Sequence, residues 1–155
     1  MYKIDSQIWL PRPLNEVFAF FSDANNLQRI TPAWLDFHVV GMSTPAIQAH
    51  TKIAYRLKIR GIRIRWQSEI TRWDPPNSFV DRQITGPYAH WNHEHVSTEE
   101  RDGTLCVDHV QYLPPGGPLL APIVNWLAVS RDVQKIFEYR RQQLEQLFPP
   151  LHQKN

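Results

Sequence analysis

Two histidines flank an acidic residue in the segment His93-Glu94-His95, and Asp108 and Tyr112 follow in the next apolar stretch. Residues i and i+2 of a β-strand point to the same side, so His93 and His95 share a face if this segment is a strand. An imidazole beside a carboxylate can serve as a general base, and a tyrosine hydroxyl can also move a proton. These residue types suit either proton transfer or the orientation of a bound polar group.

A metal site is the alternative for the same residues, because two histidines and Asp108 could supply three ligands. The sequence contains no HExxH spacing, and its single cysteine, Cys106, rules out a paired-cysteine motif. We therefore expect no metal and no cofactor. A structural role also stays open, since buried polar groups mostly hydrogen-bond one another.

The positions of these side chains depend on the hairpins that carry them. Residues 53–70 predict a hairpin with Arg60-Gly61 as its two-residue turn. That register pairs Ile59 with Ile62, Leu57 with Ile64, Tyr55 with Trp66, Lys58 with Arg63, and Arg56 with Arg65. One face is apolar and aromatic and the other is cationic, so the sheet has one buried face and one wet face.

A second hairpin is predicted around Asp102-Gly103, which places Ser97 opposite Asp108, His95 opposite Val110 and His93 opposite Tyr112. Its inner face, extended over the neighbouring strands, holds Phe79, Asp81, Gln83, Ser68, Ile70, Arg72, Trp91, His93, His95, Cys106, Asp108, Val110 and Tyr112. A register slip of one residue would turn every one of these side chains to the other face.

The remaining sequence predicts an α+β fold. A strand over residues 2–10 is followed by a helix from Pro13 through Phe21, a short helix through Leu27 and Ile30, and strands over 37–42, 78–84, 88–98 and 104–113. The last third predicts a long amphipathic helix whose stripe contains Leu119, Leu120, Ile123, Trp126, Leu127, Val133, Ile136, Phe137, Leu144 and Leu147. We expect one domain over residues 1–155, with six or seven strands curving around that helix and a cavity between them.

Composition limits the function. Six Trp, seven Phe and five Tyr among 155 residues are a heavy aromatic load, suited to a core or an apolar cavity. The net charge of +2 does not demand nucleic acid, and the aromatic residues lie away from the cationic face, so there is no stacking platform for it. The first residues lack the apolar run of a signal peptide, and we expect a cytoplasmic monomer or homodimer.

Several segments together resemble the START-like or SRPBCC superfamily, the helix-grip fold of lipid-transfer domains and polyketide cyclases/dehydrases. The resemblance is carried by Pro11 to Phe18, Phe21-Ser22-Asp23, Asn26-Leu27, Trp73 to Pro76, Phe79, Gly86-Pro87-Tyr88, Asp108 to Tyr112 and the Pro-Gly-Gly-Pro entry to the last helix. Arg65-Trp66, residues 91–95 and residues 138–141 look most like a bacterial branch often labelled cell division inhibitor. The resemblance implies a cavity for a hydrophobic small molecule, without metal or cofactor.

Three functions follow as hypotheses. The first is binding or transport of a lipid-, polyketide- or aromatic-like molecule between sheet and helix, the second is an aromatase/cyclase or dehydratase, and the third is an interaction protein linked to cell division. We expect ligand contacts from Trp66, Asp81, Gln83, Trp91, His93, His95, Asp108, Tyr112, Phe137 and Arg140, with Leu127, Val133 and Ile136 completing the helix wall. The candidate catalytic residues are His93, His95 and Asp108.

A basic surface is the other signal, formed by Lys52, Arg56, Lys58, Arg60, Arg63 and Arg65. We expect a solvated face balanced by nearby glutamates, because isolated surface charges contribute little energy. Weak contact with an anionic membrane or with an acidic carrier protein is the functional alternative.

Overall fold

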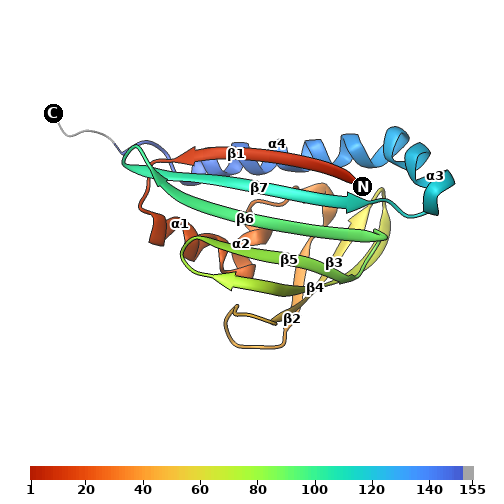
Figure 1. Ribbon diagram of the computed structural model, residues 1–155, viewed down its shortest axis with the longest axis horizontal. Coiled ribbons are helices and arrows are strands. Elements are labelled where there is room, and N and C mark those ends of the chain that lie inside the picture. The colour runs from red at the N-terminus through yellow and green to blue at the C-terminus, as the bar shows by residue number, and fades with distance from the viewer. Residues whose placement is uncertain (152–155) are drawn as a thin grey trace.

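One curved antiparallel sheet forms the body of the molecule, and the computed structural model describes residues 1–151 of the chain. The strand order is β1-β7-β6-β5-β4-β3-β2, and the sheet curls around the C-terminal helix (Figure 1). This confirms the α+β helix-grip fold. The strands are β1 (Tyr2–Leu10), β2 (His38–Met42), β3 (Lys52–Ile59), β4 (Ile62–Asp74), β5 (Ser78–Thr85), β6 (His90–Glu100) and β7 (Gly103–Leu113).

The β3–β4 hairpin has the register that the sequence predicts, from Ile59 opposite Ile62 to Tyr55 opposite Trp66. Arg60 and Gly61 both have positive φ, 50° and 80°, as a type I′ turn requires. Alternate residues of β3 are buried in the concave face of the sheet, whereas Lys52 and Arg56 between them are exposed on the convex face.

The β6–β7 hairpin turns one residue earlier than predicted, at Arg101-Asp102, whose φ angles are 52° and 60°. Gly103 is already paired with Glu100, so His93 lies opposite Val110 and His95 opposite Asp108. The pairing differs from the expected one by two residues, which leaves every side chain on its predicted face.

Gly103 lies at the start of β7 and not in the turn, and its contacts with β1 explain why this position is a glycine. A Cβ there would lie 2.5 Å from the Leu10 carbonyl oxygen and 2.5 Å from the Trp9 ring. The lack of a side chain lets β7 pass close to β1 at this point. Close approach, and not turn geometry, therefore requires glycine here.

Arg72 is on the opposite face from the expected one. A bulge in β4 between Ile70 and Arg72 breaks the alternation opposite β5. Arg72 consequently forms an ion pair with Glu94 on the convex face, while Trp73 packs against Phe18 and Phe79 inside.

The two short helices predicted after the first strand are present and close one end of the curved sheet. They are α1 (Leu14–Phe21) and α2 (Ala24–Arg29), followed by a 3-10 turn, η1 (Ala33–Leu35). Asp23 caps α2 by accepting a hydrogen bond from the Asn25 backbone N–H. Val17 and Phe18 are buried on the inner side of α1. The helices thus seal the cavity end that lies away from α3.

The C-terminal helix has three parts: α3 (Gly117–Val124), a π-helical turn η2 (Asn125–Val129) and α4 (Ser130–Leu147). Val133, Phe137 and Leu144 of α4 are buried, as expected. The apolar residues of the first part are not: Leu119 is 84%, Trp126 76% and Leu127 59% exposed. The predicted place of Leu127 in the helix wall is therefore wrong, because this stretch is apolar all round and its outer side reaches past the sheet (Figure 1).

Within residues 1–151, the helices are all too short or too polar to cross a membrane.

Candidate functional site

A cavity of about 900 Å³ lies between the concave face of the sheet and the C-terminal helix. Trp66 and Trp91 pack edge to face at a ring-centroid distance of 5.4 Å, and Tyr88 lies 4.8 Å from Trp91. Helix residues close the other side, at Val124, Ala128, Val129, Asp132, Val133, Lys135, Ile136, Phe137 and Arg140.

Seven of the ten residues expected to contact a ligand line this cavity: Trp66, Asp81, Trp91, His93, His95, Phe137 and Arg140. The other three do not line the cavity and contact other groups of the protein instead. Gln83 donates to the Tyr88 backbone carbonyl at 2.8 Å, and the Tyr112 hydroxyl donates to Asn125 Oδ1 at 2.8 Å, which ties β7 to the π-helical turn. Asp108 lies behind the two histidines.

The three candidate catalytic residues form one hydrogen-bonded cluster. Asp108 Oδ1 lies 3.0 Å from His93 Nε2 and 2.8 Å from His95 Nδ1. An ionised carboxylate only accepts hydrogen bonds, so both of these nitrogens carry the proton. The ring nitrogen that does not face Asp108 is Nε2 in His95 and Nδ1 in His93. The His95 ring is stacked on Phe79 at 4.2 Å, which fixes its plane.

Burial and charge set the protonation of this cluster. Burial lowers the pKa of His93 to about 3, with the neighbouring His95 acting in the same direction and Asp108 opposing it. Burial opposes ionisation of Asp108, but the nearby imidazole of His95 and the hydrogen bond from His93 hold the pKa of that carboxyl well below its usual value. At neutral pH the cluster thus contains a carboxylate and an uncharged His93.

Arg140 is the only buried cationic residue among the described residues of α4, and it is 9% exposed. Its Nη1 lies 3.9 Å from Asp108 Oδ2, and its guanidinium lies 5.1 Å from the centre of the Phe137 ring. Ligand atoms of His93, His95 and Asp108 lie within 4.8 Å of one another, a spacing that could hold a metal ion. The arginine beside the same carboxylate disfavours a divalent cation there.

Several lining residues were absent from the predicted site. Tyr55 and Leu57 belong to the apolar face of the first hairpin, so their alternation was a sufficient signal. Trp34 lies in η1, where no periodicity marks it, and Phe37 begins the predicted strand over 37–42, whose inner face was not assigned. Val124 and Ala128 depend on the phase of the helix near its π-helical turn.

A curved sheet that grips a helix around an aromatic cavity defines a START-like helix-grip protein. The chain belongs to the family described as polyketide cyclase / dehydrase and lipid transport, whose sequence profile matches residues 10–146. The search of curated proteins gave no match.

Solved structures share the fold at low sequence identity. TTHA0849 from Thermus thermophilus has a TM-score of 0.73 and 20% identity, covering 94% of this chain and 95% of that one. The Zhui aromatase/cyclase from Streptomyces sp. R1128 has a TM-score of 0.70 and 15% identity, covering 94% of each chain. A START superfamily protein from Mycobacterium smegmatis has a TM-score of 0.63 and 12% identity, covering 94% and 98%.

Proposed function

We propose that this protein binds and carries an apolar small molecule between its sheet and its C-terminal helix. The observation that carries the proposal is the cavity of about 900 Å³ with mostly aromatic and aliphatic walls. Ligand sites are typically about 300–1,000 Å³, apolar, and supplied with a few polar groups. His95, Asp81 and Arg140 supply those polar groups here.

Filling the cavity tests this proposal. Ala128 lines the cavity, whereas its neighbour Leu127 points outward. An Ala128→Trp variant is expected to bind a neutral fluorescent probe such as 1-aminoanthracene at least about tenfold more weakly, because the indole occupies ligand space. Leu127→Trp is the matched control and is expected to bind like the parent. The measurement is a fluorescence titration. Equal affinity in both variants would place the probe elsewhere and remove the cavity as the site.

Native mass spectrometry of protein purified from its own host identifies the natural occupant. We expect a co-purifying small molecule that disappears in Ala128→Trp and persists in Leu127→Trp. Protein that is empty in all three forms would contradict the carrier proposal.

A cyclase or dehydratase is the second candidate, favoured by His95 at the cavity wall, whose Nε2 does not face Asp108. Asp108 orients that imidazole by accepting from Nδ1, the arrangement that a general base needs. Incubation of the protein with the co-purifying molecule from the mass-spectrometry experiment separates the two functions. A carrier returns the molecule unchanged, and an enzyme converts it. The described residues offer no feature that favours a role in cell division, so we do not propose one.

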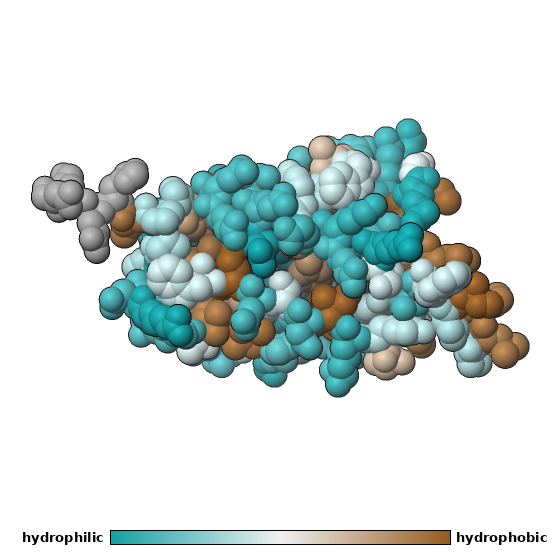
Figure 2. All heavy atoms as spheres, turned by 90° about the horizontal axis from the view of Figure 1, so that it is seen from above, coloured by the Kyte–Doolittle hydropathy of each residue, from teal (hydrophilic) through white to brown (hydrophobic). Residues whose placement is uncertain are grey.

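We further propose that the mouth of the cavity contacts an anionic membrane. Exposed lining residues mark the mouth: Trp34, Arg60, Gly61, Pro115 and Lys135. The hairpin tip and α3 lie at the same end of the molecule (Figure 1), and apolar side chains gather at that end (Figure 2). An apolar ligand that moves between such a surface and the cavity avoids water.

Charge complementarity favours lipid as the partner of this end. Arg63 and Arg65 of the bordering hairpin are exposed and form no ion pair within residues 1–151, whereas Arg60 is paired with Asp132. Each basic residue close to an anionic surface contributes about 1 kcal/mol. Exposed Leu119 and Trp126 add apolar insertion.

Vesicle flotation tests the membrane contact. The protein is expected to float with phosphatidylcholine vesicles that contain about 30 mol% phosphatidylglycerol, and much less with phosphatidylcholine alone, because the arginines need anionic lipid. A Leu119→Glu, Trp126→Glu double variant is expected to stay at the bottom. Val40→Glu, also at an exposed apolar position, serves as the control. Loss of a dimer in the double variant, without any flotation of the parent, would instead assign the patch to a second copy of the chain.

A further inference from the structure

The deep end of the cavity contains polar groups that the fold leaves without partners. Within the described chain, Arg140 Nε and Nη1 and Asp81 Oδ1 are buried and have no hydrogen-bond partner. Arg140 is 9% exposed as a residue. Unpaired buried donors and acceptors are costly and are rarely left so. Three such atoms at one place indicate that a molecule other than the polypeptide forms hydrogen bonds with them.

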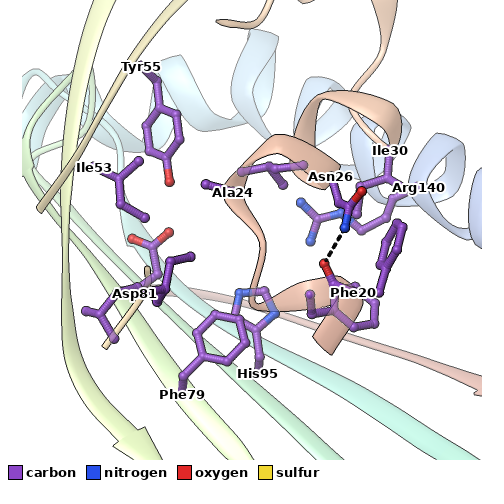
Figure 3. Close-up of a pocket in the computed structure, with 14 residues that line it drawn as sticks. Phe20, Ala24, Asn26, Ile30, Ile53, Tyr55, Phe79, Asp81, His95 and Arg140 are labelled. Carbon is purple, nitrogen blue, oxygen red and sulfur yellow. Dashed lines mark hydrogen bonds between the residues drawn. The ribbon is translucent and has the colours of Figure 1, made fainter. Parts of the chain in front are cut away.

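These groups face one shared space. A recess of about 40 Å³ is lined by Tyr55, Asp81, His95 and Arg140, and all four also line the large cavity. Figure 3 shows the guanidinium of Arg140 and the carboxylate of Asp81 on opposite sides of the recess, with the Tyr55 hydroxyl directed toward Asp81 and His95 below them. The other walls of the recess are mostly apolar, so these four residues gather its polar groups on the side that it shares with the large cavity.

The size of the recess limits what can enter it. One water needs about 10–15 Å³ of such free volume, so 40 Å³ admits a group of about three or four heavy atoms. The large cavity above it takes the apolar remainder of the ligand. A ligand that fits both parts has a small polar end pointing inward and a long apolar body pointing toward the mouth.

The charges determine the chemistry of that polar end. Arg140 offers N–H donors and requires an acceptor. Its positive charge is already balanced by Asp108, 3.9 Å away, and Asp81 stands across the recess. A carboxylate would thus face the acidic side chain of Asp81 and a cation whose charge Asp108 already balances. A carbonyl oxygen satisfies Arg140 without added charge, and a nearby hydroxyl satisfies Asp81.

We propose that the recess binds the uncharged polar end of an apolar ligand, with a carbonyl oxygen accepting from Arg140 and an adjacent hydroxyl donating to Asp81. This inference rests on the proposed carrier function and adds the orientation and the head-group class of the ligand. It also predicts discrimination against fatty acid anions of the same length.

Four C12 compounds test the head group by displacement of 1-aminoanthracene at neutral pH. They are 1-hydroxydodecan-2-one with acceptor and donor, dodecan-2-one with an acceptor, dodecan-1-ol with one hydroxyl, and dodecanoate with a charge. We expect the hydroxyketone to bind about tenfold more tightly than the ketone and the alcohol, and at least about tenfold more tightly than dodecanoate, because each buried partner is worth roughly one order of magnitude.

Variants assign the contacts. In Asp81→Leu the hydroxyketone is expected to lose its advantage over the ketone, and in Arg140→Met both carbonyl compounds are expected to bind about tenfold more weakly. Arg141→Met is the matched control, since Arg141 is exposed and paired with Glu145. Binding of 1-aminoanthracene itself reports that each variant is folded.

The outcomes separate this inference from the carrier proposal. If 1-aminoanthracene binds in the cavity and the four compounds bind equally, the recess holds water only and the head-group inference is overturned, while the carrier stands. Tightest binding of dodecanoate also overturns it, in favour of an anion site. Failure of every compound and of the probe to bind contradicts the carrier proposal itself.

Discussion

Acid is expected to destabilise the fold through His93, with the loss of stability beginning near pH 6.5, above the pH at which carboxylates titrate. Its pKa is lowered to about 3 in the folded protein by burial, and the unfolded chain returns it to about 6.5. The unfolded state therefore binds one more proton between these values, and stability falls as pH decreases through this window. The slope is about 1.4 kcal/mol per pH unit, which accumulates to roughly 4 to 5 kcal/mol over the whole window.

A His93→Gln variant isolates this contribution. Glutamine can still donate to Asp108, but it does not titrate. Between pH 4.5 and 6 we expect the free energy of unfolding, measured with urea, to depend on pH less steeply than in the parent by about 1 kcal/mol per unit. Asp108 does not interfere, because its depressed pKa removes stability only below about pH 4. His90→Gln is the control, and an unchanged slope in His93→Gln would show that His93 is protonated in the folded state.

Gly103→Ala is expected to destabilise the fold far more than the same substitution at Gly41, the other glycine that lies within a described strand. The new Cβ would lie 2.5 Å from the Leu10 carbonyl oxygen and the Trp9 ring, and β1 must move to admit it. Overpacking of this kind costs about 1–3 kcal/mol. The Trp9 indole donates to the Glu100 carbonyl at 2.7 Å, so the shift also threatens the contact that holds the β6–β7 turn.

Gly41→Ala provides the comparison in the same sheet. A Cβ at Gly41 meets no atom within 4 Å, and alanine is expected to change stability by no more than about 0.5 kcal/mol. Thermal unfolding of both variants measures the difference. A Gly103→Ala protein as stable as Gly41→Ala would show that β1 and β7 are free to separate at this end.

Side-chain alternation made much of the sheet predictable. The β3–β4 register follows from a two-residue turn and from the separation of apolar and basic residues, because a one-residue slip would bury arginines. The concave positions of Trp91, His93 and Asp108 were predictable for the same reason, even though the β6–β7 turn was placed one residue late. Because side chains alternate between the two faces with a period of two, a two-residue error in pairing leaves each side chain on the same face.

Other features depend on tertiary contacts that one sequence does not display. The bulge that sends Arg72 outward has no local signature, and Gly103 resembled a turn residue until its contact with Trp9 was known. The missing hydrogen-bond partners of Arg140 also depend on the tertiary structure, since they depend on where the fold places the carboxylates of Asp108 and Asp81. Burial of a charged helix residue was foreseeable from its position on the apolar stripe, but its missing partners were not.

The π-helical turn over residues 125–129 sets the rotational phase of everything that precedes it. A π turn contains one residue more than an α turn, which offsets the two flanking helices by about 100° around their axis. In an uninterrupted α-helix, a different edge of α3 would look into the cavity, and Leu119 and Trp126 would be turned with it. The five residues of the π-helical turn thus determine which side of α3 faces solvent, whatever the hydrophobicity of that segment.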